Sequence, residues 1–275
     1  MHVIDSFLMR KYFFLSFLLS LHEVNKLSAN MDKILTVEQL QRGEEAIEKS
    51  IYDYAKKQNL SNENFMPITD GVCSLQKYLA SSPRIMWVLK EPYDDKDESG
   101  EPKGGDWSIP KDCFKKDDAW KNCTWQPIIY SMFGLYNKLT WEEMDLIRNN
   151  HLMADILQGI AYINVSKMPA LTNSSRSPMD QYYQNWKSIL WEQINLYKPN
   201  VIIFGRTFDY FSNDFFGANG ADAEFTNDYV KAYKKDDILL LDTYHPNARP
   251  KGFRRGDYVG SIIDAINKLS INQNS

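Results

Sequence analysis

Cysteine is scarce in this chain of 275 residues: Cys73, Cys113 and Cys123 are the only three, and no two form a CxxC pair. A zinc or iron–sulfur site needs three or four ligands at recognisable spacing, so this pattern argues against a metal centre. Neither a G-x-G-x-x-G fingerprint nor a P-loop follows any apolar run, which disfavours the nucleotide-binding modules that carry them. We therefore expect no metal, no cofactor, and thiols that pack in a reducing, cytoplasmic compartment.

A dominant charge is also missing, because 32 Lys and Arg face 36 Asp and Glu for a formal net charge of −4. A chain with this balance weakly repels a polyanion as a whole, so any nucleic-acid contact must come from a local basic patch. Internal repeats and low-complexity segments are absent too. With 43% hydrophobic and 25% charged residues, the composition is typical of one well-packed globular domain.

Long apolar runs are absent as well. Residues 12–21 follow Arg10 and Lys11 and resemble the core of a secretory signal, but this run is too short to span a bilayer as a helix. No A-x-A site precedes Met31, which begins a segment that looks like an ordinary cytosolic start. We favour an over-extended reading frame over a signal peptide. We expect residues 1–30 to take no part in the fold and residues 31–275 to form a single, monomeric domain with no membrane contact.

The chain does have four apolar runs that each end in a polar cluster. They are IMWVLKEPYDD from Ile85, AYINVSKMP from Ala161, VIIFGRTFDYF from Val201 and ILLLDTYHPN from Ile238. Each run predicts a buried parallel strand whose carboxyl end delivers side chains to one edge of a sheet, where open α/β folds place their sites. Three of the clusters carry a carboxylate, an amide and an imidazole, on Glu91, Asn164 and His245.

Segments with helical spacing separate these runs. The pattern predicts helices over residues 36–54, 126–139, 180–197 and 258–269, and a long loop over residues 94–123. Strands that alternate with helices imply right-handed crossovers. The sequence therefore predicts an α/β fold, a three-layer α/β/α domain with a central parallel four-stranded sheet.

The polar clusters resemble motifs of the uracil-DNA glycosylase superfamily. LKEPYD at 89–94 looks like the family's G-Q-D-P-Y-H, and YHPNAR at 244–249 looks like its H-P-S-P. In family order, GDWSIP at 105–110 is similar to G-x-A-F-S-V, QPIIY at 126–130 to P-P-S-L, IN at 163–164 to L-L-N, and VIIFG at 201–205 to the strand ending in L-W-G. The resemblance covers residues 85–268.

The chain also departs from the family pattern. Leu89 and Lys90 replace Gly-Gln, Glu91 replaces Asp, Asp94 replaces His, and Asn247 stands where Ser is usual. Branches of the family place Asp, Asn or Ala at the acidic position. The glutamate puts the water-activating step in doubt.

The resemblance implies base excision, in which a uracil-type base is flipped out of DNA and its N-glycosidic bond is hydrolysed without a metal. Glu91 near the sugar and His245 at the base carbonyl would stabilise the opposite charges that develop as this bond breaks. Asn164 would accept from the pyrimidine N3–H and donate to O4. Trp107 would stack on the base, and Tyr93 would fill the space beside C5 and exclude a methyl group.

The implied partner is single- or double-stranded DNA that contains uracil. The residues expected to contact it follow the His-Pro motif and are Asn247, Arg249, Lys251, Phe253, Arg254 and Arg255. The cations would hold phosphates, while Arg249 or Phe253 would enter the space that the flipped base leaves. Each of these residues also has a purely structural interpretation. Two other functions therefore stay open: a catalytically impaired nucleic-acid or nucleotide-binding protein on the same fold, and a hydrolase of small nucleosides.

Overall fold

The computed structural model describes residues 35–94, 96, 98–170, 179–218 and 220–271, and all that follows concerns these. The predicted leader, residues 1–30, lies outside them. The elements discussed below belong to the unit Val37–Ser275.

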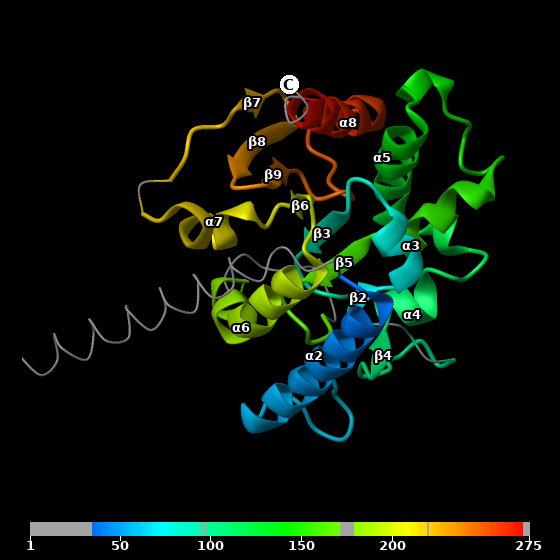
Figure 1. Cartoon of the computed structure of the whole chain (residues 1–275). Coiled ribbons are helices and arrows are strands. Elements are labelled where there is room, and N and C mark those ends of the chain that lie inside the picture. The colour runs from blue at the N-terminus through cyan, green and yellow to red at the C-terminus, as the bar shows by residue number, and fades with distance from the viewer. Residues whose placement is uncertain (1–34, 95, 97, 171–178, 219, 272–275) are drawn as a thin grey trace, which may run out of the picture. The chain divides into compact units, whose positions relative to one another are not determined.

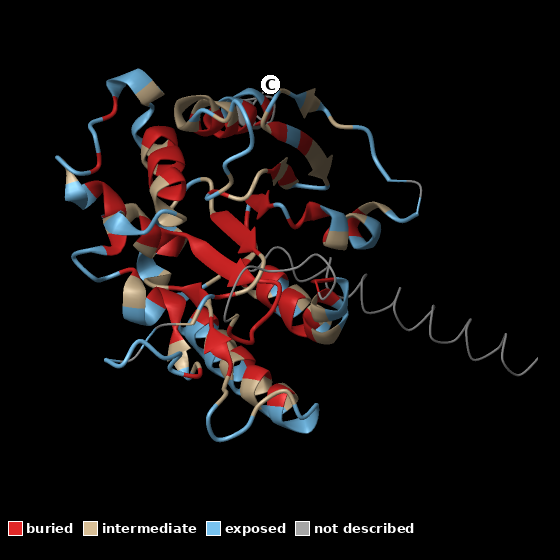
Figure 2. Ribbon diagram, turned by 180° about the vertical axis from the view of Figure 1, so that it is seen from behind, coloured by how far each residue is buried: buried red, intermediate tan, exposed pale blue. Residues whose placement is uncertain are grey.

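Four parallel strands form the centre of the main sheet (Figure 1). They are β3 (Ile85–Leu89), β5 (Ala161–Asn164), β6 (Val201–Gly205) and β9 (Ile238–Thr243). Every residue of β3, β5 and β6 is buried, which explains why they appear in the sequence as continuous apolar runs (Figure 2). The predicted strands and the mostly parallel sheet are confirmed.

The sheet is larger than the predicted four strands, because the described residues add three antiparallel ones. β2 (Gly71–Val72) pairs with β5, β8 (Val230–Lys235) pairs with β9, and β7 (Phe225–Thr226) pairs with β8. The order of this seven-stranded sheet is β2-β5-β3-β6-β9-β8-β7. Two of the added strands have only two residues, too few to show a period, and β8 is rich in exposed and half-buried lysine, so it does not appear as an apolar run.

Helices cover both faces of this sheet. α5 (Trp125–Asn137) and α8 (Arg255–Ile271) pack with alternate residues of the strands, such as Trp87 and Ile203, in one apolar core. α6 (Met179–Tyr197) lies across the other face, and α2 (Val37–Lys57) packs on α6 through Tyr54 and Trp186, whose ring centroids are 5.1 Å apart (Figure 1). Helices therefore flank a mostly parallel sheet, as the predicted α/β class requires.

Shorter elements connect these layers. They are α3 (Leu75–Ala80), α7 (Phe208–Phe216) and the 3-10 helices η1 (Ala119–Lys121), η2 (Trp141–Glu143) and η3 (His151–Gly159). The predicted loop over 94–123 is partly wrong, since it also holds β4 (Trp107–Ser108) and α4 (Ile109–Cys113). β4 pairs in parallel with β1 (Ile68–Thr69), a contact between distant segments that local sequence does not reveal. No helix in the described ranges combines the length and apolar character needed to cross a membrane.

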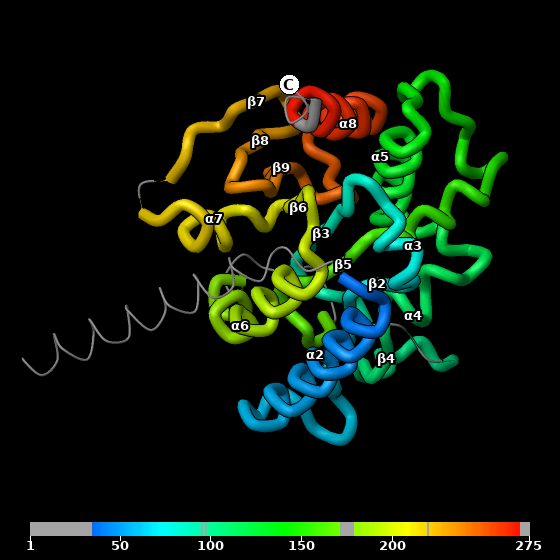
Figure 3. The backbone as a smooth tube through the Cα atoms, viewed as in Figure 1, coloured from blue at the N-terminus to red at the C-terminus, as the bar shows by residue number. Residues whose placement is uncertain are grey.

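The order of the strands marks where a site belongs. After β3 the chain forms β5 on one side of β3 and then crosses to form β6 on the other side of β3. This path can be followed along the backbone in Figure 3. β3 and β6 are therefore neighbours whose onward connections run in opposite directions. In open α/β sheets, ligands bind at such a switch point, outside the carboxyl ends of the strands.

Candidate functional site

A cavity of about 270 Å³ opens at the carboxyl ends of the parallel strands. All five residues predicted to act in catalysis or base binding line it: Glu91, Tyr93, Trp107, Asn164 and His245. The remaining lining residues were not among the predicted site residues, although some lie in the same motifs: Leu89, Pro92, Asp94, Ile109, Cys113, Lys116, Asn122, Thr124, Trp125 and Tyr162. The structure thus brings the predicted residues together from four separate segments.

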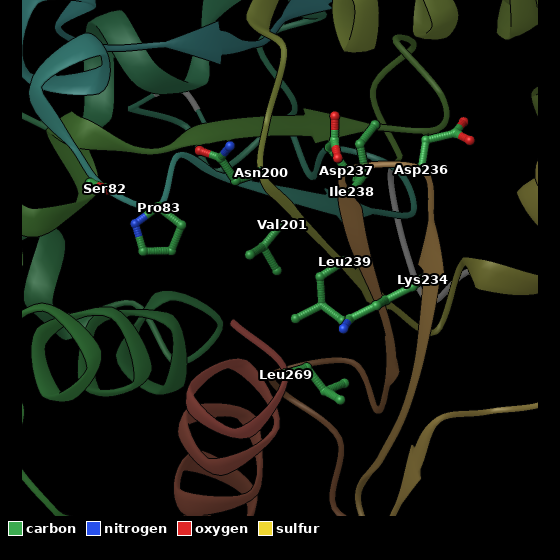
Figure 4. A pocket seen from close by; sticks show the side chains of 10 residues that line it. All are labelled: Ser82, Pro83, Asn200, Val201, Lys234, Asp236, Asp237, Ile238, Leu239 and Leu269. Carbon is green, nitrogen blue, oxygen red and sulfur yellow. The ribbon is translucent and has the colours of Figure 1, made fainter. Parts of the chain in front are cut away.

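A second cavity, of about 250 Å³, lies at the opposite edge, where β6 and β9 begin. Figure 4 shows Pro83, Val201, Leu239 and Leu269 around its middle and the carboxylates of Asp236 and Asp237 at its margin. None of the predicted site residues lines it. Because sites in open α/β sheets form at the carboxyl edge, we take the first cavity as the candidate functional site.

Asn164 ends β5 and is only 1% exposed. Its backbone N–H donates to Oδ2 of Asp70 at 2.7 Å, which fixes the residue at the sheet edge. Its side-chain Oδ1 is buried and accepts no hydrogen bond from any described residue. An unsatisfied buried acceptor costs roughly 1–3 kcal/mol, so this oxygen points to a ligand that donates.

A buried ionic network supports Asn164 from behind. The Lys167 Nζ donates to both carboxylate oxygens of Asp70, at 2.8 and 2.7 Å, and to Oε1 of Gln193 at 2.8 Å. Gln193 Nε2 in turn donates to Asp70 at 2.7 Å. Burial lowers the pKa of Lys167, and the neighbouring Asp70 carboxylate opposes this shift. This network was not predicted; the available signal in the sequence was a lysine within the mostly apolar stretch 161–168.

His245 lies in the loop that follows β9. Its Nδ1 accepts the backbone N–H of Asn247 at 3.1 Å, so the neutral ring carries its proton on Nε2. Burial, together with the positive charges of Lys90 and Arg249, lowers the pKa of His245 from 6.5 to about 4. At neutral pH the imidazole is therefore an uncharged donor in the cavity wall.

Gly205, at the end of β6, lets the strand ends approach one another. A Cβ at this position would lie 2.3 Å from Cδ2 of Leu89 and 3.1 Å from Cδ of Pro246. A larger residue would require the Leu89 side chain or the loop that carries His245 to move. Glycine here keeps the two sides of the cavity together.

Glu91 and Tyr93 leave the sheet on the segment after β3. Backbone hydrogen bonds from Ser166 to Lys90, at 2.9 Å, and from Ala170 to Pro92, at 2.8 Å, continue the pairing with the segment after β5. These bonds hold Glu91 and Asn164 at the same edge. Tyr93 is 54% exposed and stands at the cavity mouth.

Aromatic rings form much of the remaining wall. The ring of Trp107 is half-buried, and its indole Nε1–H donates to Asp94 Oδ1 at 3.3 Å. Trp125 and Tyr162 add two further rings, and each meets Phe114 edge-on. The cavity thus offers flat apolar faces beside an amide and an imidazole, a combination suited to a planar heterocycle.

The basic segment after His245 divides into two groups. Arg255 donates to Oε1 of Gln126 at 2.8 Å, in another part of the fold, whereas Arg254 pairs with Asp257 three positions on, at 2.5 Å, and its side chain stays 79% exposed. Phe253 is half-buried, and its ring packs against those of Tyr229, Tyr244 and Tyr258. The exposed side chains in this segment include Asn247, Arg249, Lys251 and Arg254.

Arg249 is nevertheless partly organised. Its guanidinium donates to the carbonyl of Ala248 at 2.6 Å and lies over the Phe253 ring, 5.9 Å from its centroid. In the conformation described, Arg249, Lys251 and Arg254 suit phosphate contact better than Arg255 and Phe253. Phe253 would have to leave its aromatic cluster to act as a wedge.

Comparison with known proteins gives no assignment: no protein-family model matches this chain, and no curated protein matches it. No disulfide links the three cysteines, which all fall within the described ranges. Within those ranges no three His, Cys, Asp or Glu side chains gather as metal ligands do.

Proposed function

We propose that this protein is a DNA glycosylase that binds a flipped uracil-type base in the cavity at the carboxyl edge of the sheet and hydrolyses its N-glycosidic bond. The observation that carries the proposal is the buried, unsatisfied Oδ1 of Asn164 in the same cavity as the Nε2–H of His245. Uracil presents an N3–H donor beside a carbonyl acceptor and complements this pair. Cytosine has an unprotonated N3, so it would leave the Asn164 oxygen unsatisfied.

The same arrangement supports bond cleavage. As the bond between C1′ and N1 breaks, its electron pair moves onto the base, and negative charge develops on O2. A neutral His245 that donates from Nε2 stabilises this charge without having to protonate the base fully. The ring is already oriented by Asn247, so little reorganisation is needed during the reaction.

Glu91 serves the other side of the reaction. Positive charge develops on the sugar, and a carboxylate at the cavity wall stabilises it. Water then adds its hydroxyl to C1′ and gives its proton to a carboxylate or to the departing base, which leaves an abasic sugar and free uracil. Glutamate carries one methylene more than aspartate, so its carboxylate would reach further into the cavity.

Hydrolysis of a small nucleoside is the second candidate. It is favoured by the hydrogen bond from Arg255 to Gln126, which occupies one of the cations predicted to hold phosphates. Such an enzyme would use the same base contacts with a smaller phosphate footprint.

The test is release of free uracil by the full chain from three substrates: a single-stranded oligonucleotide with one deoxyuridine, the same strand in a duplex, and deoxyuridine itself. Matched oligonucleotides with deoxycytidine or thymidine are the controls. Release from DNA that Asn164→Ala abolishes supports the glycosylase, and release from deoxyuridine alone supports the nucleosidase. No release from any substrate by the parent protein would overturn both.

A further inference from the structure

We propose that Asp94 is a positioning residue: it locks the Trp107 ring in the cavity wall by joining the indole to the segment that carries Glu91. Its effect on catalysis rests on the proposed function, whereas the lock itself does not. Asp94 and Trp107 both line the cavity and lie 13 positions apart in the chain.

The Asp94 carboxylate accepts three N–H groups. Oδ2 accepts the backbone N–H of Gly104 at 2.6 Å, while Oδ1 accepts that of Gly105 at 3.2 Å and the Trp107 indole Nε1–H at 3.3 Å. Hydrogen bonds to an ionised carboxylate are stronger than those between neutral groups. One side chain therefore ties both the turn before Trp107 and the ring itself to the end of β3.

The turn can offer these donors only because it is built from glycine. Gly104 and Gly105 have φ of +85° and +83°, a region that favours glycine, and their consecutive N–H groups both donate to the Asp94 carboxylate. A Cβ would lie 2.1 Å from the Asn64 carbonyl oxygen at the first position and 2.0 Å from that of Met66 at the second. The turn is thus packed on the 64–67 segment, which gives the carboxylate a fixed support.

The chemistry explains why aspartate stands where the resemblance leads us to expect histidine. A neutral imidazole has one acceptor nitrogen, and an imidazolium has none. Only a carboxylate can accept all three N–H groups. Glu98 lies in the same acidic stretch, but its side chain is exposed, so Asp94 differs from it in accepting N–H groups at the cavity.

Locking the indole along its edge fixes the plane of the ring. A base that stacks on a ring already in place does not have to order it, so the lock strengthens base binding in the ground state and transition state alike. Loss of such uniform binding raises KM and leaves kcat nearly unchanged. This pattern separates a stacking wall from the groups that act on the reacting bond.

Asp94→Asn tests the proposal, because the amide has a single acceptor oxygen and must turn its NH₂ toward at least one of the three donors. Asp106→Asn is the matched control: it makes the same isosteric change in the same turn, at an exposed side chain whose Oδ1 accepts the Tyr52 hydroxyl at 3.1 Å. The first measurement is hydrogen exchange of the Trp107 indole N–H by nitrogen-15 NMR, assigned with Trp107→Phe. We expect exchange to accelerate about tenfold or more in Asp94→Asn and to stay unchanged in Asp106→Asn.

The second measurement is steady-state uracil release from the single-stranded oligonucleotide. We expect KM to rise about tenfold in Asp94→Asn with kcat within about twofold of the parent, and neither to change in Asp106→Asn. If the parent releases no base, the proposed function fails, but the exchange measurement still decides whether the lock exists. Equal indole exchange in the two variants would overturn the lock; faster exchange with an unchanged KM would overturn its role in base binding.

Should Asp94→Asn fail to fold, Trp107→Phe provides the test. This variant keeps a ring for stacking and leaves the two bonds from the carboxylate to the glycine turn intact. We expect its KM to rise about tenfold, with its melting temperature near that of the parent. A KM equal to the parent's would show that the indole bond contributes nothing to binding.

Discussion

Replacing Lys167 by methionine is expected to lower the free energy of unfolding by about 3–5 kcal/mol, because it strands a buried carboxylate. Lys167 and Asp70 both have side chains with 0% exposure, and the Nζ to Oδ2 distance is 2.7 Å. Methionine replaces most of the aliphatic stem, so the variant leaves only a small cavity. The loss therefore measures the missing charge and its hydrogen bonds.

The magnitude follows from what Asp70 keeps. The carboxylate loses two charge-assisted bonds from Nζ and retains two donors, the Gln193 amide and the Asn164 backbone N–H, each at 2.7 Å. Neither of these neutral donors compensates a full negative charge in a buried site. Adding Asp70→Asn to the variant removes that charge, so the double variant should regain at least about 1 kcal/mol.

Urea unfolding at pH 7, followed by circular dichroism, measures both variants. Lys111→Met is the matched control, since Lys111 pairs with Glu48 at 2.6 Å but the two side chains are 51% and 36% exposed. We expect that control to lose less than about 1 kcal/mol, as exposed ion pairs do. A loss of similar size in Lys167→Met would refute the reasoning, because it would mean that the buried charge has found another partner.

Three further predictions concern the site. In single-turnover assays His245→Ala should slow base excision by about a hundred- to thousandfold, and full activity in this variant would contradict its role. Glu91→Gln should also slow this step, and the loss in the double variant should be smaller than the two single losses combined, because both residues serve one transition state. Asn164→Asp should release uracil more slowly than the parent from the same oligonucleotide, since a carboxylate cannot donate to O4; equal rates would contradict base reading by this residue. Because folding lowers the pKa of His245 from 6.5 to about 4, the unfolded chain takes up a proton at a higher pH than the folded protein does. The free energy of unfolding should therefore fall as the pH drops from 6.5 to about 4. Urea titrations at several pH values should show a smaller fall in His245→Gln, and equal slopes would argue against the shift.

The strands and their site residues could be predicted because parallel strands carry their own signal. A strand buried on both faces must be apolar throughout, so the runs from Ile85, Ala161, Val201 and Ile238 stand out. The carboxyl ends of such strands share one edge, and this alone brings Glu91, Asn164 and His245 into one cavity.

The support behind the site could not be predicted, because it depends on contacts between distant residues. Asp70 and Lys167 are 97 positions apart, and Asp70 lies between two strands of two residues each, where no periodicity develops. In the sequence, Asp70 looks like an ordinary turn residue. Only the fold reveals that it is paired and holds Asn164.

The formal net charge of −4 counts every carboxylate equally, but in the structure the carboxylates are compensated to different degrees. Of the carboxylates near the site, that of Asp70 is compensated by Lys167, and that of Asp94 is surrounded by three N–H dipoles. Lys116 is exposed and lines the cavity, and Arg249 is exposed on the loop beside it. Both lie where a phosphate would approach. The local field that an anionic ligand meets is set by these exposed and unequally screened groups, so the acidic balance of the whole chain is no argument against a nucleic-acid substrate.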